Sequence, residues 1–107
     1  MNLEIKKDLV SNWFKTLQDA FCDDICKIEK NKSQFKSTMW KKNIKKNEGG
    51  GEYRILQNGK VFEKVGVNFS KVYGKFPKQF QNKIPGAQKD PKFWASGISV
   101  VMQDRKE

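Results

Sequence analysis

The clearest chemical pattern lies near the C-terminus, where large and small side chains alternate. A strand sends successive side chains to opposite faces, so Phe93 to Met102 would have one bulky face and one nearly bare face. The bulky set is Trp94, Ile98, Val100 and Met102, and the bare set is Ala95, Gly97 and Ser99. We interpret the bare face as a surface that accepts a flat ligand.

The same alternation occurs earlier, with Val65, Val67 and Phe69 on one side and Gly66, Asn68 and Ser70 on the other. We hypothesise that the two bare faces, including Gly97, join into one cleft floor. Its hydrogen-bonding groups would be Ser99, Ser70 and Asn68. A sheet with one face toward water explains the same pattern without any ligand, so the residues alone leave both interpretations open.

Metal and acid–base chemistry have few candidates, because the chain contains no histidine. Cys22 and Cys26 lie four residues apart on a predicted helix and supply only two thiolates, which is too few for a good metal site. A disulfide within one helical turn would be strained. We therefore expect buried, reduced thiols and no metal site in this chain.

The composition is that of one small globular domain of 107 residues, with 36% hydrophobic and 32% charged residues. No apolar run approaches the roughly 20 residues that a membrane-spanning helix needs. The N-terminus also lacks the apolar core of a secretory signal. These features predict a cytoplasmic protein without a membrane partner.

The formal charge of +10, from 22 basic and 12 acidic residues, raises the alternative of a small lysine-rich nucleic-acid-binding module. Only Arg54 and Arg105 are arginines, whereas base and phosphate recognition draws heavily on the guanidinium fork. The lysines are spread along nearly every segment, and the densest cluster is Lys41 to Lys46. We therefore favour a general solubilising role for the lysines over nucleic-acid binding.

The segment from Gly49 to Gly74 predicts a β-hairpin, over about 52–73. Three glycines open it, a strand-like run from Glu52 to Gln57 follows, and a second β-prone run extends from Lys60 to Tyr73. Between them lies Asn58-Gly59, the dipeptide best suited to a two-residue turn with positive φ at both central positions.

The remaining elements are a helix over about 3–30, a proline-punctuated loop over 76–91 and a strand over about 93–102. In the helix, apolar residues recur at steps of three and four, which places them on one stripe. These are Val10, Phe14, Leu17, Phe21, Ile25 and Ile28, widened by Trp13 and Ala20. We expect this stripe to pack on the sheet and Lys15, Gln18, Asp19 and Asp23 to face water. The fold class is therefore α+β, an N-terminal helix packed on an antiparallel sheet.

Several motifs together resemble the oxygen-dependent coproporphyrinogen III oxidases, haem-pathway enzymes that convert two propionates of a tetrapyrrole into vinyl groups. The motifs are LQDAFC (17–22), Trp40, the glycine-rich turn with Tyr-Arg-Ile-Leu, Asn-Gly, VFEKVGVNFS (61–70) and FWASGISVV (93–101). The resemblance covers most of this chain, but family members are more than twice as long. It implies that the sheet is the first part of a larger one flanked by helices on both faces.

The resemblance also implies roles for particular residues. Ser99 matches a serine that contacts the substrate, coproporphyrinogen III. Arg54 matches an arginine that either pairs with a propionate or holds the glycine turn. The segment Val61 to Ser70 matches a region of homodimer contacts, which competes with the cleft-floor interpretation. The reaction implied uses dioxygen as co-substrate without a metal or organic cofactor.

Departures from the family pattern indicate a truncated domain over 1–107. Glu48 stands where relatives place a first glycine, and Gln103 stands where many place histidine. The family's later His-Pro and Pro-Thr-x-His segments have no counterpart here. We therefore expect an N-terminal fragment that is inactive alone, of marginal stability or associated through strand edges. A non-catalytic remnant that only binds tetrapyrrole is the further alternative.

Overall fold

The computed structural model describes residues 2–30 and 34–105, which form one long helix packed on a four-stranded antiparallel sheet. The helix is α1 (Leu3–Glu29), and the strands are β1 (Lys36–Lys41), β2 (Gly49–Gln57), β3 (Phe62–Lys75) and β4 (Lys92–Asp104). A four-residue helix, α2 (Lys78–Gln81), interrupts the loop between β3 and β4. The predicted α+β class and antiparallel sheet are confirmed.

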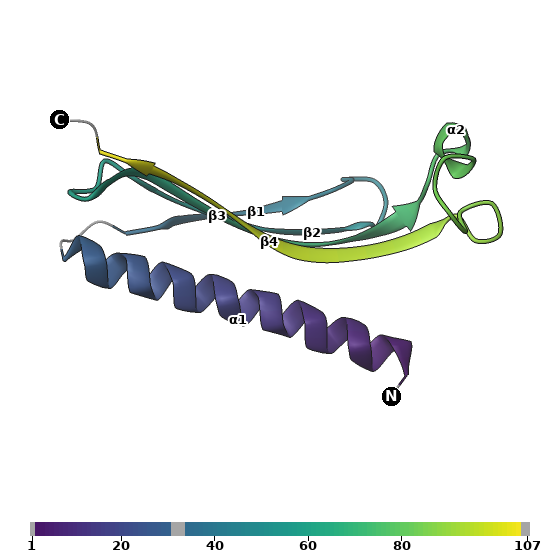
Figure 1. Cartoon of the computed structure of the whole chain (residues 1–107), viewed down its shortest axis with the longest axis horizontal. Helices are drawn as coiled ribbons and strands as arrows, with labels where there is room; N and C mark the ends of the chain where they lie inside the picture. Colours follow the sequence, from purple (N-terminus) through teal and green to yellow (C-terminus); the bar gives the residue numbers. More distant parts are fainter. Residues whose placement is uncertain (1, 31–33, 106–107) are drawn as a thin grey trace.

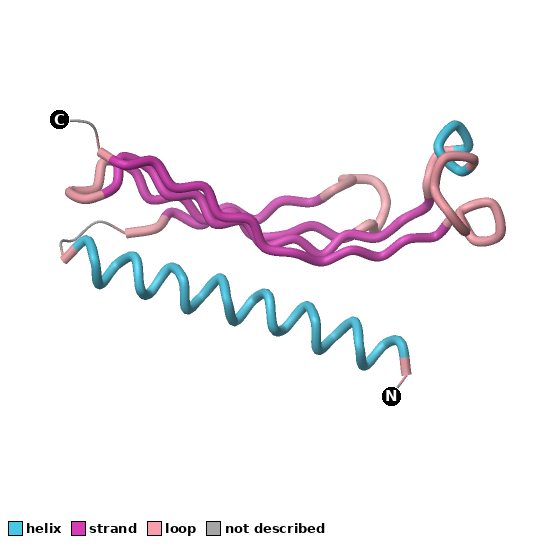
Figure 2. Tube along the Cα trace, viewed as in Figure 1, coloured by secondary structure: helices cyan, strands magenta, loops and turns pink. Residues whose placement is uncertain are grey.

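The strands follow one another in the order β1-β2-β3-β4. The β1–β2 and β3–β4 connections therefore lie at one end of the sheet, and the β2–β3 turn lies at the other, beside the end of β4 (Figures 1 and 2). Helix α1 covers one face, and no long helix of the described residues covers the other (Figure 1). Within the described residues, neither helix has an apolar stretch long enough to cross a bilayer.

The core lies between α1 and the helix-facing side of β2, β3 and β4. Its fully buried strand residues are Leu56, Val65 and Val67, which the register places side by side. The helix contributes Cys22 and Ile25. Helix α1 begins at a cap in which the Asn2 side chain accepts a hydrogen bond from the backbone of Ile5, at 2.8 Å.

Helix α1 is rotated relative to the expected packing. The residues buried against the sheet are Ser11, Gln18, Cys22, Ile25 and Glu29, so the prediction that Gln18 faces water is wrong. Much of the apolar stripe is turned away from the sheet, with Trp13 61% and Ile28 50% exposed. The reason is that the sheet offers α1 polar partners, described below, which only the polar side of the helix can satisfy.

The β2–β3 turn also differs from the expected two-residue turn. It spans residues 58–61. Asn58 and Gly59 were both expected to have a positive φ, but only Asn58 does, with a φ of 58°. The buried Glu29 carboxylate enters this turn and accepts hydrogen bonds from the backbone of Lys60 (2.6 Å), Val61 (3.2 Å) and Phe62 (2.9 Å). A Cβ at Gly59 would lie 2.6 Å from Glu29 Oε2, so glycine is required there for close approach.

Glu29 therefore joins the end of α1 to the turn of the hairpin, and its ionisation should affect stability. Burial alone would raise the pKa of the Glu29 carboxyl, but the backbone donors of Phe62, Val61 and Lys60 outweigh this and lower it. A lowered folded-state pKa means that the stabilisation is present above the unfolded pKa and is lost as the pH falls through the folded one.

We expect Glu29→Gln to lower the free energy of unfolding by about 1–3 kcal/mol at neutral pH, because one oxygen can no longer accept as an anion. Urea unfolding at pH 7 and at pH 4 measures this, and the difference between variant and wild type should shrink at the lower pH. Glu63→Gln, at an exposed position of β3, is the matched control. An equal loss in both variants would contradict the role of Glu29.

Candidate functional site

The uncovered face of the sheet brings together four of the predicted site residues. Asn68 on β3 is directly opposite Ser99 on β4, and Ser70 is opposite Gly97. Ala95, opposite Val72, continues the same face, and both Ala95 and Ser99 are exposed. The bare sets of the two strands therefore form one surface. Binding of a ligand to this surface remains a prediction.

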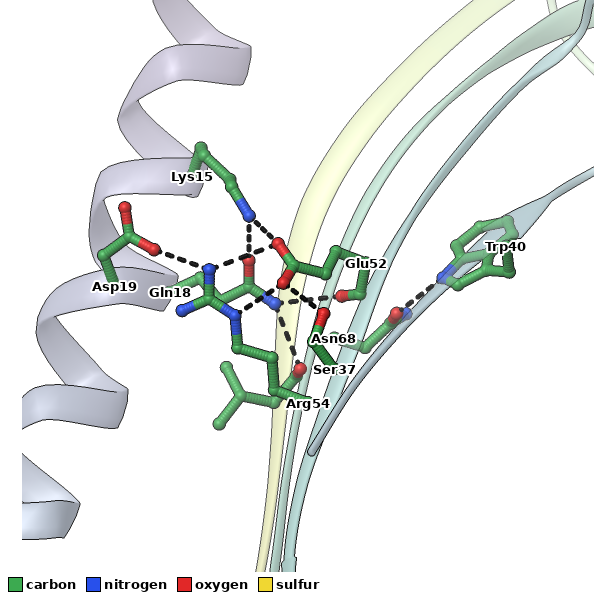
Figure 3. A network of polar contacts seen from close by, with 9 residues as sticks. Lys15, Gln18, Asp19, Ser37, Trp40, Glu52, Arg54 and Asn68 are labelled. Carbon is green, nitrogen blue, oxygen red and sulfur yellow. Dashed lines mark hydrogen bonds and ion pairs between the residues drawn. The ribbon is translucent and has the colours of Figure 1, made fainter. Parts of the chain in front are cut away.

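Two aromatic residues that the sequence interpretation did not assign to this face also lie on it. Trp40 is paired with Gly51, and its indole N–H donates to Asn68 Oδ1 at 2.9 Å (Figure 3). A Cβ at Gly51 would lie 2.8 Å from the Trp40 ring, so the missing side chain makes room for the indole. Tyr53, paired with Asn68, lies on the same face. Alternation along β2 places Tyr53 on the same face as Gly51, whereas the position of Trp40 depends on the pairing of β1 with β2.

A cation and two stacked rings border the same face at its loop end. Phe93 is opposite Gly74, and its ring stacks on Phe76 with centroids 4.8 Å apart. Lys42 Nζ lies 4.5 Å from the centre of the Phe93 ring and 3.5 Å from Glu48. Hydrogen bonding from Asn43 and the nearby Lys42 hold the pKa of the Glu48 carboxyl below its usual value. The surface thus combines hydroxyl, amide and aromatic groups with the Lys42–Glu48 ion pair at one end.

Arg54, the other predicted substrate contact, lies on the opposite, helix-facing side of the sheet. Its guanidinium is 2.8 Å from Asp19 of α1 and 2.9 Å from Glu52 of the same strand (Figure 3). The structure does not bring Arg54 together with Ser99. Its pairing with a propionate stays a prediction, and in the described structure both carboxylates already engage it.

The charged residues between α1 and β2 form a defined network, which explains the rotation of the helix. Glu52 also contacts Lys15 and accepts a hydrogen bond from Ser37 at 2.5 Å. Gln18, completely buried, donates to the backbone carbonyls of Glu52 (2.9 Å) and Val67 (3.2 Å) (Figure 3). Buried polar groups need such partners, so this side of α1 must face the sheet.

The network shifts the ionisation of its members. Hydrogen bonding from Arg54, helped by Lys15 and Ser37 and opposed by burial, lowers the pKa of Glu52 to about 2. The same contact raises the pKa of Arg54. Cys22 lies beside Arg54, and burial raises the pKa of its thiol despite the nearby cation. Cys22 and Cys26 are both free thiols, the first buried and the second half-buried.

Two cavities lie largely on the helix-facing side of the sheet, although Trp40 and Gly51 also line the larger one. One, of about 980 Å³, lies at the glycine-rich end of β2 and is lined by five lysines, Lys15, Lys41, Lys45, Lys46 and Lys71, among others. The other, of about 650 Å³, lies between the first turns of α1 and β4. Asn68, Ser70, Gly97 and Ser99 line neither cavity. The predicted cleft floor is thus an open surface in the described structure.

Comparison with known proteins identifies the family of this chain. The sequence profile described as Coproporphyrinogen III oxidase matches residues 9–106. The chain belongs to the coproporphyrinogen III oxidase family. The resemblance inferred from the motifs is therefore confirmed.

Curated relatives of the family include the oxygen-dependent coproporphyrinogen-III oxidases of Rickettsia africae, Rickettsia felis and Rickettsia typhi. Each is 46% identical to this chain, over 105, 99 and 109 residues respectively. The matches cover 94%, 89% and 94% of this chain but only 37%, 36% and 37% of the relatives. The chain thus spans little more than a third of the length of the curated relatives it matches.

The pKa of Glu52 can be used to test whether Arg54 has a structural role in this network. In Arg54→Met we expect the pKa of Glu52 to rise from about 2 toward its ordinary 4.5, because the principal cause of the lowering is gone. The free energy of unfolding should fall by about 2 kcal/mol at neutral pH. The wild-type stabilisation is present above pH 4.5 and is lost as the pH falls toward 2.

Carboxyl-detected NMR titration of Glu52, together with urea unfolding, provides the measurement. Lys64→Met, which removes an exposed cation from β3, is the control. If the Glu52 titration is the same in Arg54→Met and wild type, the network does not operate as described.

Proposed function

We propose that this chain supplies part of the substrate platform of an oxygen-dependent coproporphyrinogen III oxidase and corresponds to the N-terminal portion of the longer relatives. The observation that carries the proposal is the meeting of Asn68, Ser70, Gly97 and Ser99 on the uncovered face. Small residues leave the backbone accessible there, and a flat tetrapyrrole can lie across such a surface. The family match supports this choice of ligand.

On this proposal the platform binds and orients coproporphyrinogen III. Ser99 offers a hydroxyl, Ser70 a second one, and Trp40 an aromatic surface beside Asn68. Lys42, which is partly exposed and shares its charge with Glu48, is a cation on this face that could pair with an acidic group at the edge of the ring system. Dioxygen is the proposed co-substrate, with no metal or organic cofactor, and the chain works in the cytoplasm.

The chain would orient substrate without converting it. General acid–base catalysis near neutral pH needs a group that titrates there, histidine being the usual one, and this chain has none. The charged residues Glu52 and Arg54 are engaged on the other side of the sheet. Oxidative decarboxylation therefore requires residues from the part of the relatives that this chain does not match.

The family's homodimer remains part of the proposal. The segment Val61 to Ser70 lies largely in β3, whose two edges are already paired with β2 and β4. Contacts through this segment would therefore use its side chains on the uncovered face, not its backbone.

Binding to the bare face is tested best at Gly97. A Cβ there meets only Ser70 Oγ, at 3.9 Å, so a larger side chain is compatible with the fold and projects from the platform. We expect Gly97→Leu to weaken the binding of coproporphyrin III, a stable oxidised analogue, by about tenfold or more, equivalent to about 1.4 kcal/mol. Titration followed by porphyrin absorbance measures this.

Val100→Leu is the matched control, because Val100 lies on the same strand but on the helix-facing side. Equal affinity in Gly97→Leu and Val100→Leu would exclude the bare face as the binding surface. If the chain instead binds RNA with a steep salt dependence and no porphyrin, the nucleic-acid alternative would replace the proposal.

The second expectation concerns catalysis. Purified chain supplied with coproporphyrinogen III under air should form no protoporphyrinogen IX above the rate without protein, as measured by fluorescence after oxidation of the product. The Rickettsia africae oxidase under the same conditions is the positive control. Formation of protoporphyrinogen IX by this chain alone would refute the proposal that it binds the substrate without converting it.

A further inference from the structure

The side-chain amide of Asn68 is held in one orientation by Trp40. The indole N–H of Trp40 donates to Asn68 Oδ1 at 2.9 Å (Figure 3). An indole nitrogen can only donate, so the amide atom that faces it must be the carbonyl oxygen. The oxygen and the nitrogen of an amide lie on different sides of its carbon atom. The amino group of Asn68 is therefore directed away from the indole.

This amino group has no partner in the structure. Among the residues that the structure describes, no hydrogen bond involves the amide nitrogen of Asn68, Nδ2. In the same residues, no side-chain nitrogen or oxygen atom is both buried and without a hydrogen bond. Asn68 Nδ2 is therefore accessible to solvent, and it offers two N–H donors at the uncovered face of the sheet.

Ser99 supplies a further donor beside this amino group. Ser99 is exposed and lies directly opposite Asn68 in the pairing of β3 with β4. Residues opposite one another on antiparallel strands have Cβ atoms about 4.5–5.5 Å apart, so both side chains can contact one small group. The amino group of Asn68 cannot accept, whereas the hydroxyl of Ser99 can turn to donate. The pair is therefore suited to an ionised carboxylate, whose two oxygens only accept.

The contact with Trp40 also makes the amide a better donor. Hydrogen bonds in a chain polarise one another, so donation to Asn68 Oδ1 strengthens donation from Asn68 Nδ2. The indole is closely packed, because a Cβ at Gly51 would lie 2.8 Å from its ring. Two nearby carboxylates are engaged elsewhere, Glu52 by Arg54 on the other face and Glu48 by Lys42 at the loop end. The amino group is thus fixed in place and free for a ligand.

We propose that Asn68 and Ser99 together bind one carboxylate of an acidic ligand, and that Trp40 is a positioning residue that keeps the Asn68 amino group turned toward it. The identity of the ligand rests on the proposed function, in which this carboxylate is a propionate of coproporphyrinogen III. Binding of the carboxylate itself does not require the tetrapyrrole. Free propionate is therefore an independent probe of the site.

A purely structural role, in which the Trp40 contact only ties β1 to β3, predicts different results. Asn68→Asp separates the two roles, because it keeps an oxygen for the indole and replaces the amino donor with an oxygen that repels a carboxylate. Thr38→Asp is the matched control. Thr38 is exposed and is paired with Tyr53, which is paired with Asn68, so the variant adds the same charge to the same face.

NMR of the 15N-labelled chain tests the carboxylate site without a tetrapyrrole. We expect sodium propionate to shift the Asn68 amino signals in a saturable way, and sodium chloride at equal ionic strength to leave them in place. Trp40→Phe keeps an aromatic ring but removes the indole N–H. It should weaken propionate binding by about threefold. Amino signals that do not respond to propionate, or that respond equally in Trp40→Phe, would overturn the proposal.

Titration with coproporphyrin III tests the same site with the larger ligand. We expect Asn68→Asp to weaken binding by about tenfold or more and Thr38→Asp by less than about threefold. Trp40→Phe should weaken binding in the wild-type chain but have no further effect in Asn68→Asp, because both changes act on one amino group. Urea unfolding confirms that each variant is folded. Equal losses in Asn68→Asp and Thr38→Asp would reduce the effect to general charge and overturn the proposal.

The failure of this inference can be distinguished from the failure of the proposed function. If Gly97→Leu weakens porphyrin binding and Asn68→Asp does not, the bare face binds the ring and the carboxylate site is rejected. If the wild-type chain binds no porphyrin but propionate shifts the Asn68 amino signals, the carboxylate site stands and the tetrapyrrole is rejected as its ligand.

Discussion

The ion pair between Arg54 and Glu52, with Asp19 and Gln18 of α1 around it, determines how the helix lies on the sheet. Turning the apolar stripe inward would bury side chains such as Trp13 and Val10, each worth about 1.5–3 kcal/mol. The same rotation would remove Gln18 from the backbone carbonyls of Glu52 and Val67, and would separate Asp19 from Arg54 and Lys15 from Glu52. Leaving a buried polar group unsatisfied costs about 1–3 kcal/mol, and the Gln18 amide, its two carbonyl partners and two ion pairs would all be affected. Together these losses offset the gain from burying the apolar side chains. The exposed stripe is the consequence of that balance.

Glu29 fixes the other end of α1 by binding the turn between β2 and β3. With polar attachments at its middle and at its C-terminal end, the helix is confined to one side of the sheet along β3 and β4. The described residues contain no second long helix. The face with Asn68, Ser70, Gly97 and Ser99 is therefore left open, and the small size of these residues is compatible with that exposure.

Structural features that depend on local periodicity can be predicted from the sequence. Features that depend on contacts with side chains far along the chain cannot. Alternation in β3 and β4 correctly indicated which residues share a face, because the period of a strand is a property of the backbone. The rotation of α1 was not predictable from its own residues, since Glu52 and Arg54 lie more than 30 positions further along the chain. Similarly, Asn58-Gly59 favours a tight turn on its own, but the carboxylate of Glu29 opens it. The position of Trp40 over Gly51 likewise depends on pairing between β1 and β2.

The two faces of the sheet carry different kinds of polar group. Glu52, Arg54, Asp19 and Lys15 neutralise one another on the helix side, so they hold the fold and have little capacity left for a ligand. The bare face has neutral donors and acceptors, aromatic rings and the Lys42–Glu48 ion pair at one end. Under the proposed function, such groups would hold a flat anionic molecule in a fixed orientation without taking or giving protons. One part of the oxidase would then orient the substrate, and another part would carry out the reaction. The geometry of the orienting surface would not depend on which residues catalyse the reaction.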